Sequence, residues 1–438
     1  MKLALFGDLL DVVTAPPPDA ALDEPPPGVR WRPAHWLLIE DGRIAAIQTE
    51  PPGPGWTREE RAGQLILPGF IDTHVHAPQL DVIASYGSEL LDWLQRYTFP
   101  AETAWADPAV AAAGSARFLD QLLAHGSTSA LVFPTVHKTS CSALFEAALQ
   151  RGMRLIAGKC LMDRNAPPAL TDTLASSERD SLELLALLAA WQGQGRSHRL
   201  AYAHTVRFAP TSSEAQLRLA GELLAAHPDS HLQTHVAENR AEVEWVRQLF
   251  PADRSYLGVY ERHGLLGPRS TLAHGIWLDA EDRARLRATQ AVIAHSPTSN
   301  LFLGSGLFDW RGHAAEGLRL SVASDVGGGT SLSMQRTLAA AYQVAALQGR
   351  RLDAFTLLHA ATAGNAASLQ LQQEIGRLEP GWVADVCAWD WAEDGSLLAQ
   401  RLQRAESLHE RLFAWLLLGD ERLLRRVWVA GVQRVARD

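Results

Sequence analysis

Short apolar runs alternate with longer amphipathic segments through the middle of the chain. Apolar runs bounded by Gly, Pro or polar clusters predict buried strands, and Ala- and Leu-rich segments such as 181–191 and 214–226 predict helices. The predicted strands span 69–76, 129–134, 154–162, 200–208, 231–236, 270–275, 291–295 and 319–325. Eight strands separated by helices favour an α/β fold with a parallel (β/α)8 TIM-type barrel. An open doubly wound sheet is the alternative.

The two ends of the chain have a different, strand-rich pattern. Two apolar runs flank Asp41-Gly42, which is a strong hairpin signal. Segments 381–389 and 426–435 are also rich in strand-forming residues and are punctuated by turn residues. The pattern predicts that both ends join in one small sheet domain.

These patterns together predict the domain organisation. We expect residues 1–66 and 376–438 to form a composite β-sandwich domain, and residues 67–375 to form the catalytic barrel. The Pro-rich segment 15–27 cannot continue a ladder of strand hydrogen bonds, so it is expected to be an exposed loop.

Length and charge narrow the class of protein. A chain of 438 residues with 47% hydrophobic content can form one large barrel with a smaller appended domain. The formal net charge of −9 argues against a nucleic-acid backbone as the main partner. A small-molecule partner is therefore expected.

The cysteines and the apolar runs indicate the compartment. Cys141, Cys160 and Cys387 are odd in number and lack metal-finger spacing, which fits a reducing environment better than a disulfide framework. The first residues do not resemble a secretory signal, and no apolar run is long enough to span a bilayer. We expect a cytoplasmic protein that does not associate with membranes.

Metal-affine side chains occur at the ends of four predicted strands. His74 and His76 end the first strand, and their two-residue spacing places both imidazoles on one face. His235, His274 and Asp325 end the fifth, sixth and eighth strands. Each alone could be an ordinary core histidine or turn carboxylate. Because active sites in barrels are built at the carboxyl ends of the strands, the set together predicts a metal site.

The motifs around these residues resemble a known family. Residues 68–76, with His235, His274 and Asp325 at later strands, resemble the amidohydrolase superfamily of metal-dependent hydrolases. Several further motifs are similar to its guanine-deaminating branch: 76–79, 86–94, 97–102, 207–208, 234–239 and 295–301. The likeness runs from roughly residue 65 to residue 385.

The resemblance implies a metal centre and an assembly. It implies one zinc ion per subunit with four ligands: His74, His76, His235 and Asp325. Relatives with two metals use a carbamylated lysine at the end of strand 4, and neither Lys138 nor Lys159 lies on that predicted strand. Imidazole and carboxylate ligands also suit iron. Relatives are often dimeric, so a homodimer is expected.

The resemblance also implies catalytic roles in a hydrolytic deamination of guanine to xanthine and ammonia, a step of purine catabolism. Asp325 is positioned to take a proton from the attacking water, and Glu238 to protonate a ring nitrogen and then assist departure of ammonia. His274 would hydrogen-bond the hydroxide or the developing oxyanion. Glu238 could instead be an ordinary acid at a helix N-terminus.

Substrate recognition is expected from side chains next to these groups. Arg207 can donate to the 6-carbonyl of guanine, where adenine presents an amino group. Phe208 offers a ring for stacking, and Gln79 can pair with another ring edge. His235 and Glu238 would also border the substrate.

Two other functions also fit the sequence. The first is another mononuclear hydrolase of the same fold, an aminohydrolase or chlorohydrolase acting on an adenosine-like, cytosine or triazine substrate. The second is a noncatalytic scaffold, which would be expected to have lost metal ligands. A cytidine-deaminase type of zinc site is disfavoured because its paired cysteines are missing.

Overall fold

The computed structural model describes residues 1–87, 90–196 and 198–437 and divides into two compact units. The first unit comprises residues 1–72, 121–129 and 333–438, and the second comprises residues 73–120 and 130–332. The domain boundaries expected after residues 66 and 375 stay a prediction.

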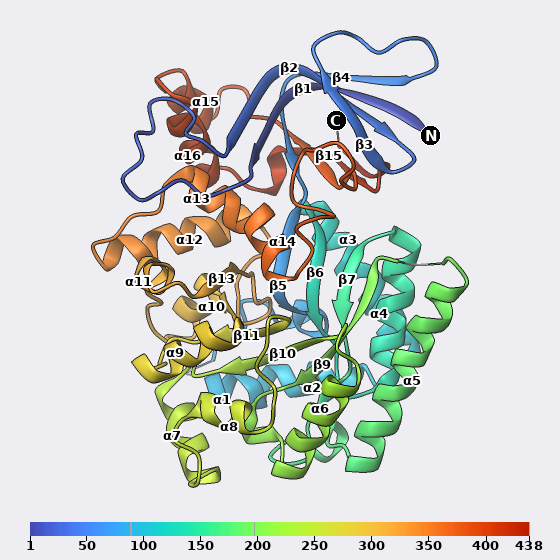
Figure 1. The fold of residues 1–438 in the computed structure, drawn as a ribbon, viewed down its shortest axis with the longest axis vertical. Coiled ribbons are helices and arrows are strands. Elements are labelled where there is room, and N and C mark those ends of the chain that lie inside the picture. Colours follow the sequence, from blue (N-terminus) through green and yellow to red (C-terminus); the bar gives the residue numbers. More distant parts are fainter. Residues whose placement is uncertain (88–89, 197, 438) are drawn as a thin grey trace. The chain divides into compact units, whose positions relative to one another are not determined.

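A mainly parallel sheet forms a barrel in the middle of the chain (Figure 1). Its strands are β5 (Phe70–His76), β6 (Ser127–Phe133), β7 (Arg154–Ala157), β8 (Cys160–Leu161), β9 (Leu200–Val206), β10 (His231–Val236), β11 (Ser270–His274), β12 (Val292–His295) and β13 (Arg319–Val322). They follow the order β5-β6-β7-β9-β10-β11-β12-β13, with β8 beside β9. Asp325 N donates to His74 O at 2.9 Å, which joins the last strand to the first. The (β/α)8 barrel predicted from the sequence is confirmed.

One predicted strand is interrupted. Segment 154–162 forms β7 and β8 with Gly158 and Lys159 between them. A Cβ atom on Gly158 would lie 1.8 Å from the carbonyl oxygen of Ala203 in β9. The close backbone approach therefore requires glycine at this position.

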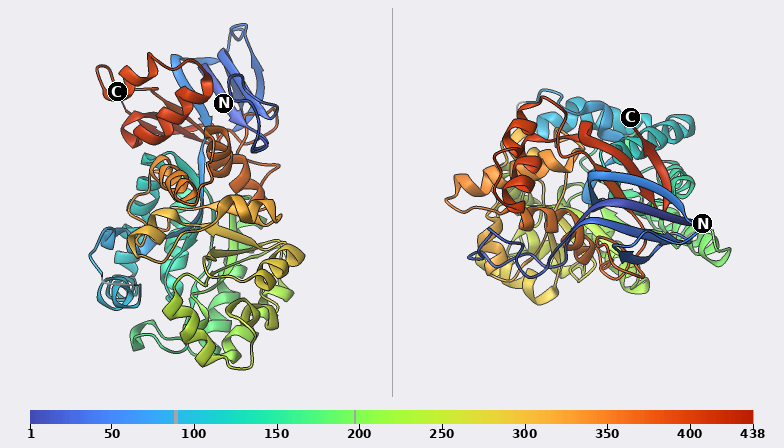
Figure 2. Two further views of the ribbon diagram at one scale, coloured as in Figure 1. Left: turned by 90° about the vertical axis from the view of Figure 1, so that its left-hand side faces the viewer. Right: turned by 90° about the horizontal axis from the view of Figure 1, so that it is seen from above.

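Helices follow the barrel strands as the alternating pattern predicts (Figure 2). The helices are α1 (Leu90–Trp93), α2 (Phe99–Ala104), α3 (Pro108–Ala124), α4 (Lys138–Arg151), α5 (Leu174–Gly193), α6 (Glu214–Ala226), α7 (Arg240–Leu249), α8 (Tyr256–Arg262), α9 (Ala280–Thr289), α10 (Pro297–Phe302), α11 (Trp310–Ala315), α12 (Met334–Leu347), α13 (Ala354–His359), α14 (Asn365–Ser368), α15 (Leu397–Leu402) and α16 (Leu408–Leu418). Helix α6 begins where the side chain of Ser213 accepts a hydrogen bond from Gln216 N, a typical N-cap. Across the described part of the chain, no helix has both the length and the apolar character that crossing a membrane requires.

An apolar core lies between the barrel strands and the helices that follow them. Val206, Leu232, Leu272 and Ile293 come from four neighbouring strands, and Leu217 comes from α6. All five are wholly buried. Close packing of this kind fixes the strand ends, from which the site residues project.

The two termini form a second, seven-stranded sheet. Its strands are β1 (Lys2–Val12), β2 (Val29–Glu40), β3 (Arg43–Gln48), β4 (Thr57–Pro68), β14 (Val386–Trp389), β15 (Leu424–Val429) and β16 (Val432–Ala436), in the order β16-β15-β14-β4-β1-β2-β3. Asp41 and Gly42 have φ of 49° and 81° and form the tight hairpin between β2 and β3. The additional sheet domain built from both ends is confirmed, and residues 15–27 lie outside its strands.

Candidate active site

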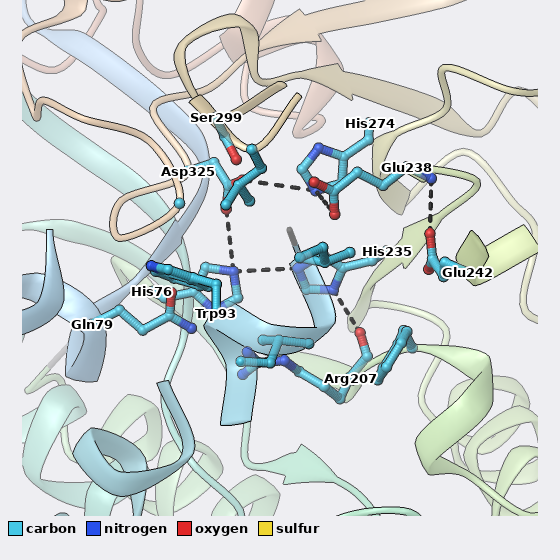
Figure 3. Close-up of a pocket in the computed structure, with 15 residues that line it drawn as sticks. His76, Gln79, Trp93, Arg207, His235, Glu238, Glu242, His274, Ser299 and Asp325 are labelled. Carbon is cyan, nitrogen blue, oxygen red and sulfur yellow. Dashed lines mark hydrogen bonds and ion pairs between the residues drawn. The ribbon is translucent and has the colours of Figure 1, made fainter. Parts of the chain in front are cut away.

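A pocket lies at the carboxyl ends of the barrel strands (Figure 3). It is lined by His76, Gln79, Leu90, Trp93, Leu94, Arg207, Phe208, His235, Glu238, Glu242, His274, Ser299, Leu303, Asp325 and Gly328. The predicted site residues are all among them except His74, which is fully buried. The structure thus brings these residues together from distant parts of the chain.

The strand ends place each metal-affine side chain. His74 and His76 end β5, and the side chains of both converge on the same cluster because alternate residues share a strand face. His235 lies on β10, and His274 is the last residue of the adjacent β11. Asp325 follows β13 and adopts a positive φ of 50°, and His274 has a φ of 74°. Both residues occupy a sparsely populated backbone region, as is common at functional sites.

Four imidazoles and one carboxylate converge in this pocket. His76 Nε2 lies 3.3 Å from both His74 Nε2 and His235 Nε2. Asp325 Oδ1 lies 3.1 Å from His74 Nε2 and 3.3 Å from His76 Nε2. His274 Nε2 lies 3.7 Å from Asp325 Oδ2. Ligand atoms of His74, His235, His274 and Asp325 all lie within 4.8 Å of one another.

The electrostatics of this cluster fit a cation. Burial lowers the pKa of His76 to about 3 and the pKa of His235 well below 6.5, so both imidazoles are neutral. Burial raises the pKa of Asp325, but interactions with His74 and His76 outweigh burial and place it well below 3.8. Unprotonated imidazole nitrogens and an ionised carboxylate that face one another present lone pairs to a shared point. A divalent metal ion fits this donor set.

Hydrogen bonds behind two imidazoles fix their orientation. His235 Nδ1 donates to the carbonyl oxygen of Arg207 at 2.6 Å, which turns its Nε2 toward the cluster. His274 Nδ1 donates to Asn300 Oδ1 at 2.9 Å and likewise turns its Nε2 into the pocket. Such partners behind the ring set both the tautomer and the direction of a metal-binding or catalytic histidine.

Glu238 is held in the pocket as a protonated acid. Its Oε2 lies 3.3 Å from His274 Nε2, and its Oε1 accepts a hydrogen bond from Ser305 Oγ at 2.8 Å. Burial, with the nearby charge of Asp325, raises the pKa of Glu238 to about 8. Helix α7 begins two residues later with a capping box of Asn239 and Glu242, which fixes the backbone that carries Glu238.

The predicted recognition residues line one part of the pocket. Arg207 follows β9, is 3% exposed, and its Nη1 lies 2.5 Å from Glu102 Oε1. Burial lowers the pKa of Arg207, but its ion pair with Glu102 raises the net value, so the guanidinium stays charged. Phe208 is buried and belongs to the same apolar cluster as Trp93, and Gln79 is 1% exposed. A flat heterocycle with polar edges fits such a lining.

Sequence reasoning missed four residues that support the site. Asn300 accepts a hydrogen bond from His274, and Ser305 donates one to Glu238. Glu242 accepts from the backbone N of Glu238 at 3.0 Å. Glu102 forms an ion pair with Arg207. Glu102 and Asn300 lie inside the motifs that resemble the family, so their motif membership was an available signal. Ser305 follows a turn outside those motifs, so no signal in the sequence pointed to its role.

Comparison with known proteins agrees with this geometry. The model of the Amidohydrolase family matches residues 65–432. Guanine deaminase from Escherichia coli strain K12 is 44% identical over 401 residues, covering 90% of each chain, and a probable guanine deaminase from Deinococcus radiodurans is 41% identical, covering 86% of this chain and 85% of its own.

Solved structures give the same result. The structure of E. coli guanine deaminase aligns over 100% of both chains with a TM-score of 0.91 and 38% identity. Guanine deaminase from C. acetobutylicum, solved with bound guanine in its active site, aligns over 99% of this chain and 100% of its own with a TM-score of 0.88 and 26% identity. The chain belongs to the amidohydrolase family.

Proposed function

We propose that this protein deaminates guanine hydrolytically, giving xanthine and ammonia, and that it serves purine catabolism. The observation that carries the proposal is one pocket in which a cation-binding cluster adjoins a protonated Glu238 and a charged Arg207. The cluster fits activation of water, and the neighbouring side chains fit a purine ring. Relatives that are 44% and 41% identical and carry the name guanine deaminase support the choice of substrate.

The cluster would hold one metal ion, for which zinc is proposed. Its ligands would be His74, His76, His235 and Asp325, whose facing atoms lie 3.1 to 3.3 Å apart where they are in contact. A bound zinc ion lowers the pKa of water and so provides a nucleophile near neutral pH. Iron binds the same ligand types, so metal analysis of the purified protein decides between them.

The protein's own groups move the protons. Asp325 is ionised and accepts a proton from the water that attacks carbon 2 of the ring. The hydrogen bond between His274 Nδ1 and Asn300 Oδ1 directs Nε2 of His274 toward that water, which it orients by a hydrogen bond. Glu238 donates its proton to a ring nitrogen as the tetrahedral centre forms, and Asp325 passes the proton that it took from water to the amino group, which leaves as ammonia when the C–N bond breaks. The new hydroxyl on carbon 2 gives its proton to Glu238 and becomes the 2-carbonyl of xanthine, so both carboxyl groups return to their starting states and the atoms balance.

Recognition is assigned to the side chains around the ring. The Arg207 guanidinium donates to the 6-carbonyl of guanine and would leave a donor unpaired against the 6-amino group of adenine. The Phe208 ring stacks on the purine, and the Gln79 amide pairs with another edge. His235 and Glu238 border the same space in Figure 3. If Arg207→Ala kept both the wild-type rate with guanine and the preference for guanine over adenine, this assignment would be contradicted.

The purified protein tests the function directly. Ammonia release is followed with guanine, adenine, cytosine and a chlorinated triazine, before chelation, after chelation and after zinc is restored. We expect release from guanine alone at an appreciable rate, with loss on chelation and recovery with zinc. Faster turnover of another substrate would transfer the proposal to a different hydrolase of this fold. Absence of any metal-dependent rate would favour a scaffold function.

We also propose that the protein is a homodimer and that it is located in the cytoplasm. The reducing compartment is supported by the cysteines, since Cys141, Cys160 and Cys387 are buried free thiols. Light scattering coupled to size-exclusion chromatography measures the subunit number, and a mass of 47.8 kDa would show a monomer instead.

A further inference from the structure

One buried carboxylate contacts both polar recognition side chains. Oε1 of Glu102 lies 2.5 Å from Nη1 of Arg207 and accepts a hydrogen bond from Nε2 of Gln79 at 3.0 Å. Glu102 lies on α2, is 0% exposed and is not part of the pocket lining. Both of its hydrogen-bonded side-chain partners, Arg207 and Gln79, line the pocket.

Building on the proposed function, we propose that Glu102 is a positioning residue that determines purine specificity by holding Arg207 and Gln79 in one fixed arrangement. The substrate class is a purine with a carbonyl at position 6. The role is distinct from that of the groups that move protons.

The ion pair restricts Arg207. A free arginine side chain has many rotamers. A ligand that binds it must offset the conformational entropy lost when the side chain is fixed in one rotamer. Glu102 fixes the guanidinium before a ligand arrives, which lowers the cost of binding. Among the residues that the structure describes, Glu102 is the carboxylate within ion-pair distance of Arg207. Its removal would leave a buried cation uncompensated.

Glu102 also sets the direction of the Gln79 amide. Gln79 Nε2 donates to Glu102, and Gln79 Oε1 accepts from Gly327 N at 3.2 Å. The reversed amide would place its oxygen against the carboxylate and its NH2 group against an N–H, so the network selects one orientation. One N–H and one acceptor lone pair of Gln79 then remain for a ring edge. Without Glu102, the amide keeps the hydrogen bond from Gly327 N but loses the contact that fixes its NH2 group, so its orientation is less firmly held.

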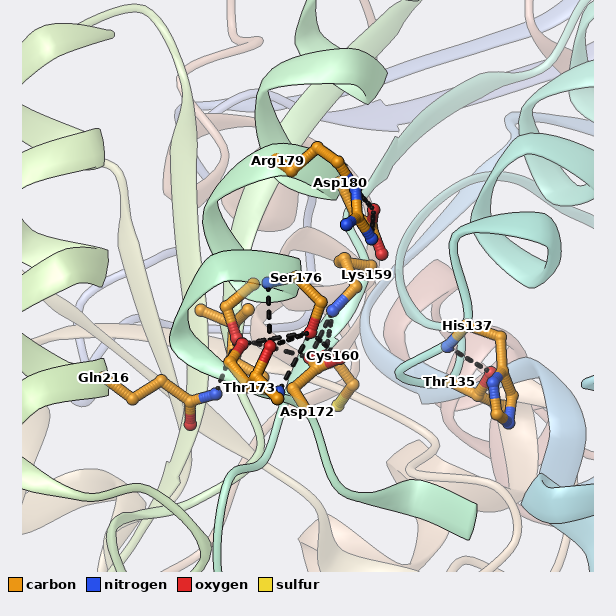
Figure 4. A network of polar contacts seen from close by, with 12 residues as sticks. Thr135, His137, Lys159, Cys160, Asp172, Thr173, Ser176, Arg179, Asp180 and Gln216 are labelled. Carbon is orange, nitrogen blue, oxygen red and sulfur yellow. Dashed lines mark hydrogen bonds and ion pairs between the residues drawn. The ribbon is translucent and has the colours of Figure 1, made fainter.

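Two variants and a matched control separate this role from general stability. Glu102→Ala removes both contacts, and Glu102→Gln keeps an oxygen acceptor of similar shape but removes the charge. The control is Asp172→Asn, because Asp172 pairs with Lys159, another fully buried cation, and among the described contacts neither residue lines the pocket or hydrogen-bonds Arg207 or Gln79 (Figure 4).

The measurements report binding apart from chemistry. They are kcat and KM for guanine, the inhibition constant of hypoxanthine, the metal content and the thermal midpoint. Hypoxanthine keeps the 6-carbonyl and lacks the 2-amino group, so it binds without being deaminated. We expect Glu102→Ala to raise KM and the hypoxanthine constant about 10- to 100-fold, the range for hydrogen bonds to charged groups. Glu102→Gln should raise both less, and metal content should not change.

The control and a double variant complete the test. Asp172→Asn should lower the thermal midpoint while KM and the hypoxanthine constant stay at wild-type values. In a protein that already carries Arg207→Ala and Gln79→Ala, loss of Glu102 should change the hypoxanthine constant by no more than about twofold, since residues that act through each other are not additive.

Three results would overturn the inference. They are unchanged KM and hypoxanthine constants in both Glu102 variants, an equal rise in Asp172→Asn, and full additivity in the triple variant. If Glu102→Ala does not fold, Glu102→Gln carries the comparison alone. A wild-type protein that releases no ammonia from guanine would refute the proposed function, whereas an active wild type with unaffected Glu102 variants would refute this inference only.

Discussion

Replacing Glu238 by glutamine should remove the proton donor while leaving the pocket intact. Glutamine has nearly the same shape, so its oxygen can still accept from Ser305 Oγ, which lies 2.8 Å from Glu238 Oε1. Its NH2 group can donate toward His274 Nε2, which lies 3.3 Å from Glu238 Oε2. The amide cannot, however, give up a proton to a ring nitrogen. General acid catalysis contributes about 10²- to 10⁴-fold, so kcat should fall by that factor, or by about 3 to 5.5 kcal/mol in activation free energy.

The assay is ammonia release from guanine, with KM, metal content and thermal midpoint measured on the same preparations. We expect KM, metal content and midpoint close to wild type, because Glu238 is not a proposed metal ligand. Glu242→Gln is the matched control: Glu242 is also a buried carboxylate that lines the pocket, but it binds backbone N–H groups and Tyr256. The control should retain activity within about tenfold, the effect of a typical hydrogen bond. A Glu238→Gln protein that stays within tenfold of wild type, or that loses its metal, would refute the assignment.

Three further predictions concern the orientation of the His274 ring, the bound metal and the buried His204. Asn300→Ala removes the acceptor for His274 Nδ1 and should lower kcat about 2- to 10-fold, whereas Asn300→Asp keeps an acceptor and should retain more activity; equal losses in steady-state assays would contradict the role. Chelation should abolish ammonia release and lower the thermal midpoint, because a metal at a hundredfold excess over its Kd stabilises the folded state by about 2.7 kcal/mol; an unchanged midpoint in calorimetry would show that no metal is bound. Burial lowers the pKa of His204 from 6.5 to about 4, so the unfolded chain binds a proton below pH 6.5 that the folded protein takes up only near pH 4. The contribution of His204 to the free energy of unfolding is therefore largest above pH 6.5. It falls by about 1.4 kcal/mol per pH unit as the pH drops from 6.5 toward 4. His204→Leu should reduce the drop in midpoint between pH 7.5 and pH 5 relative to wild type, and parallel curves for the two proteins would count against it.

The barrel and the cluster could be predicted because both follow from periodic sequence features. Alternation of apolar strands and amphipathic helices gave the strand count, and the carboxyl ends of parallel strands share one edge. His74 and His76, two residues apart on β5, and His235 and His274 on adjacent strands were therefore placed together before any geometry was known. The interruption at Gly158 was not predictable from periodicity, since it depends on the backbone of β9 packing against that residue.

The supporting residues follow no such rule. Glu102 reaches Arg207 across 105 positions of sequence, and Ser305 reaches Glu238 across 67. Such contacts depend on how loops and short helices pack over the strand ends, and no local period encodes that packing. Motif resemblance marks the neighbourhood of Glu102, but its partner became visible only in the structure.

The two carboxylates proposed to be catalytic show most clearly what the structure adds. From the sequence, Asp325 and Glu238 were both acids at strand ends, and their different roles came from resemblance alone. In the structure both side chains are buried, and burial by itself raises the pKa of each. Contact with His74 and His76 reverses the shift for Asp325, whereas Glu238 faces a nearby negative charge and keeps its proton to about pH 8. Opposite environments thus favour an ionised Asp325 and a protonated Glu238, the pair of states that the proposed hydrolytic deamination near neutral pH requires.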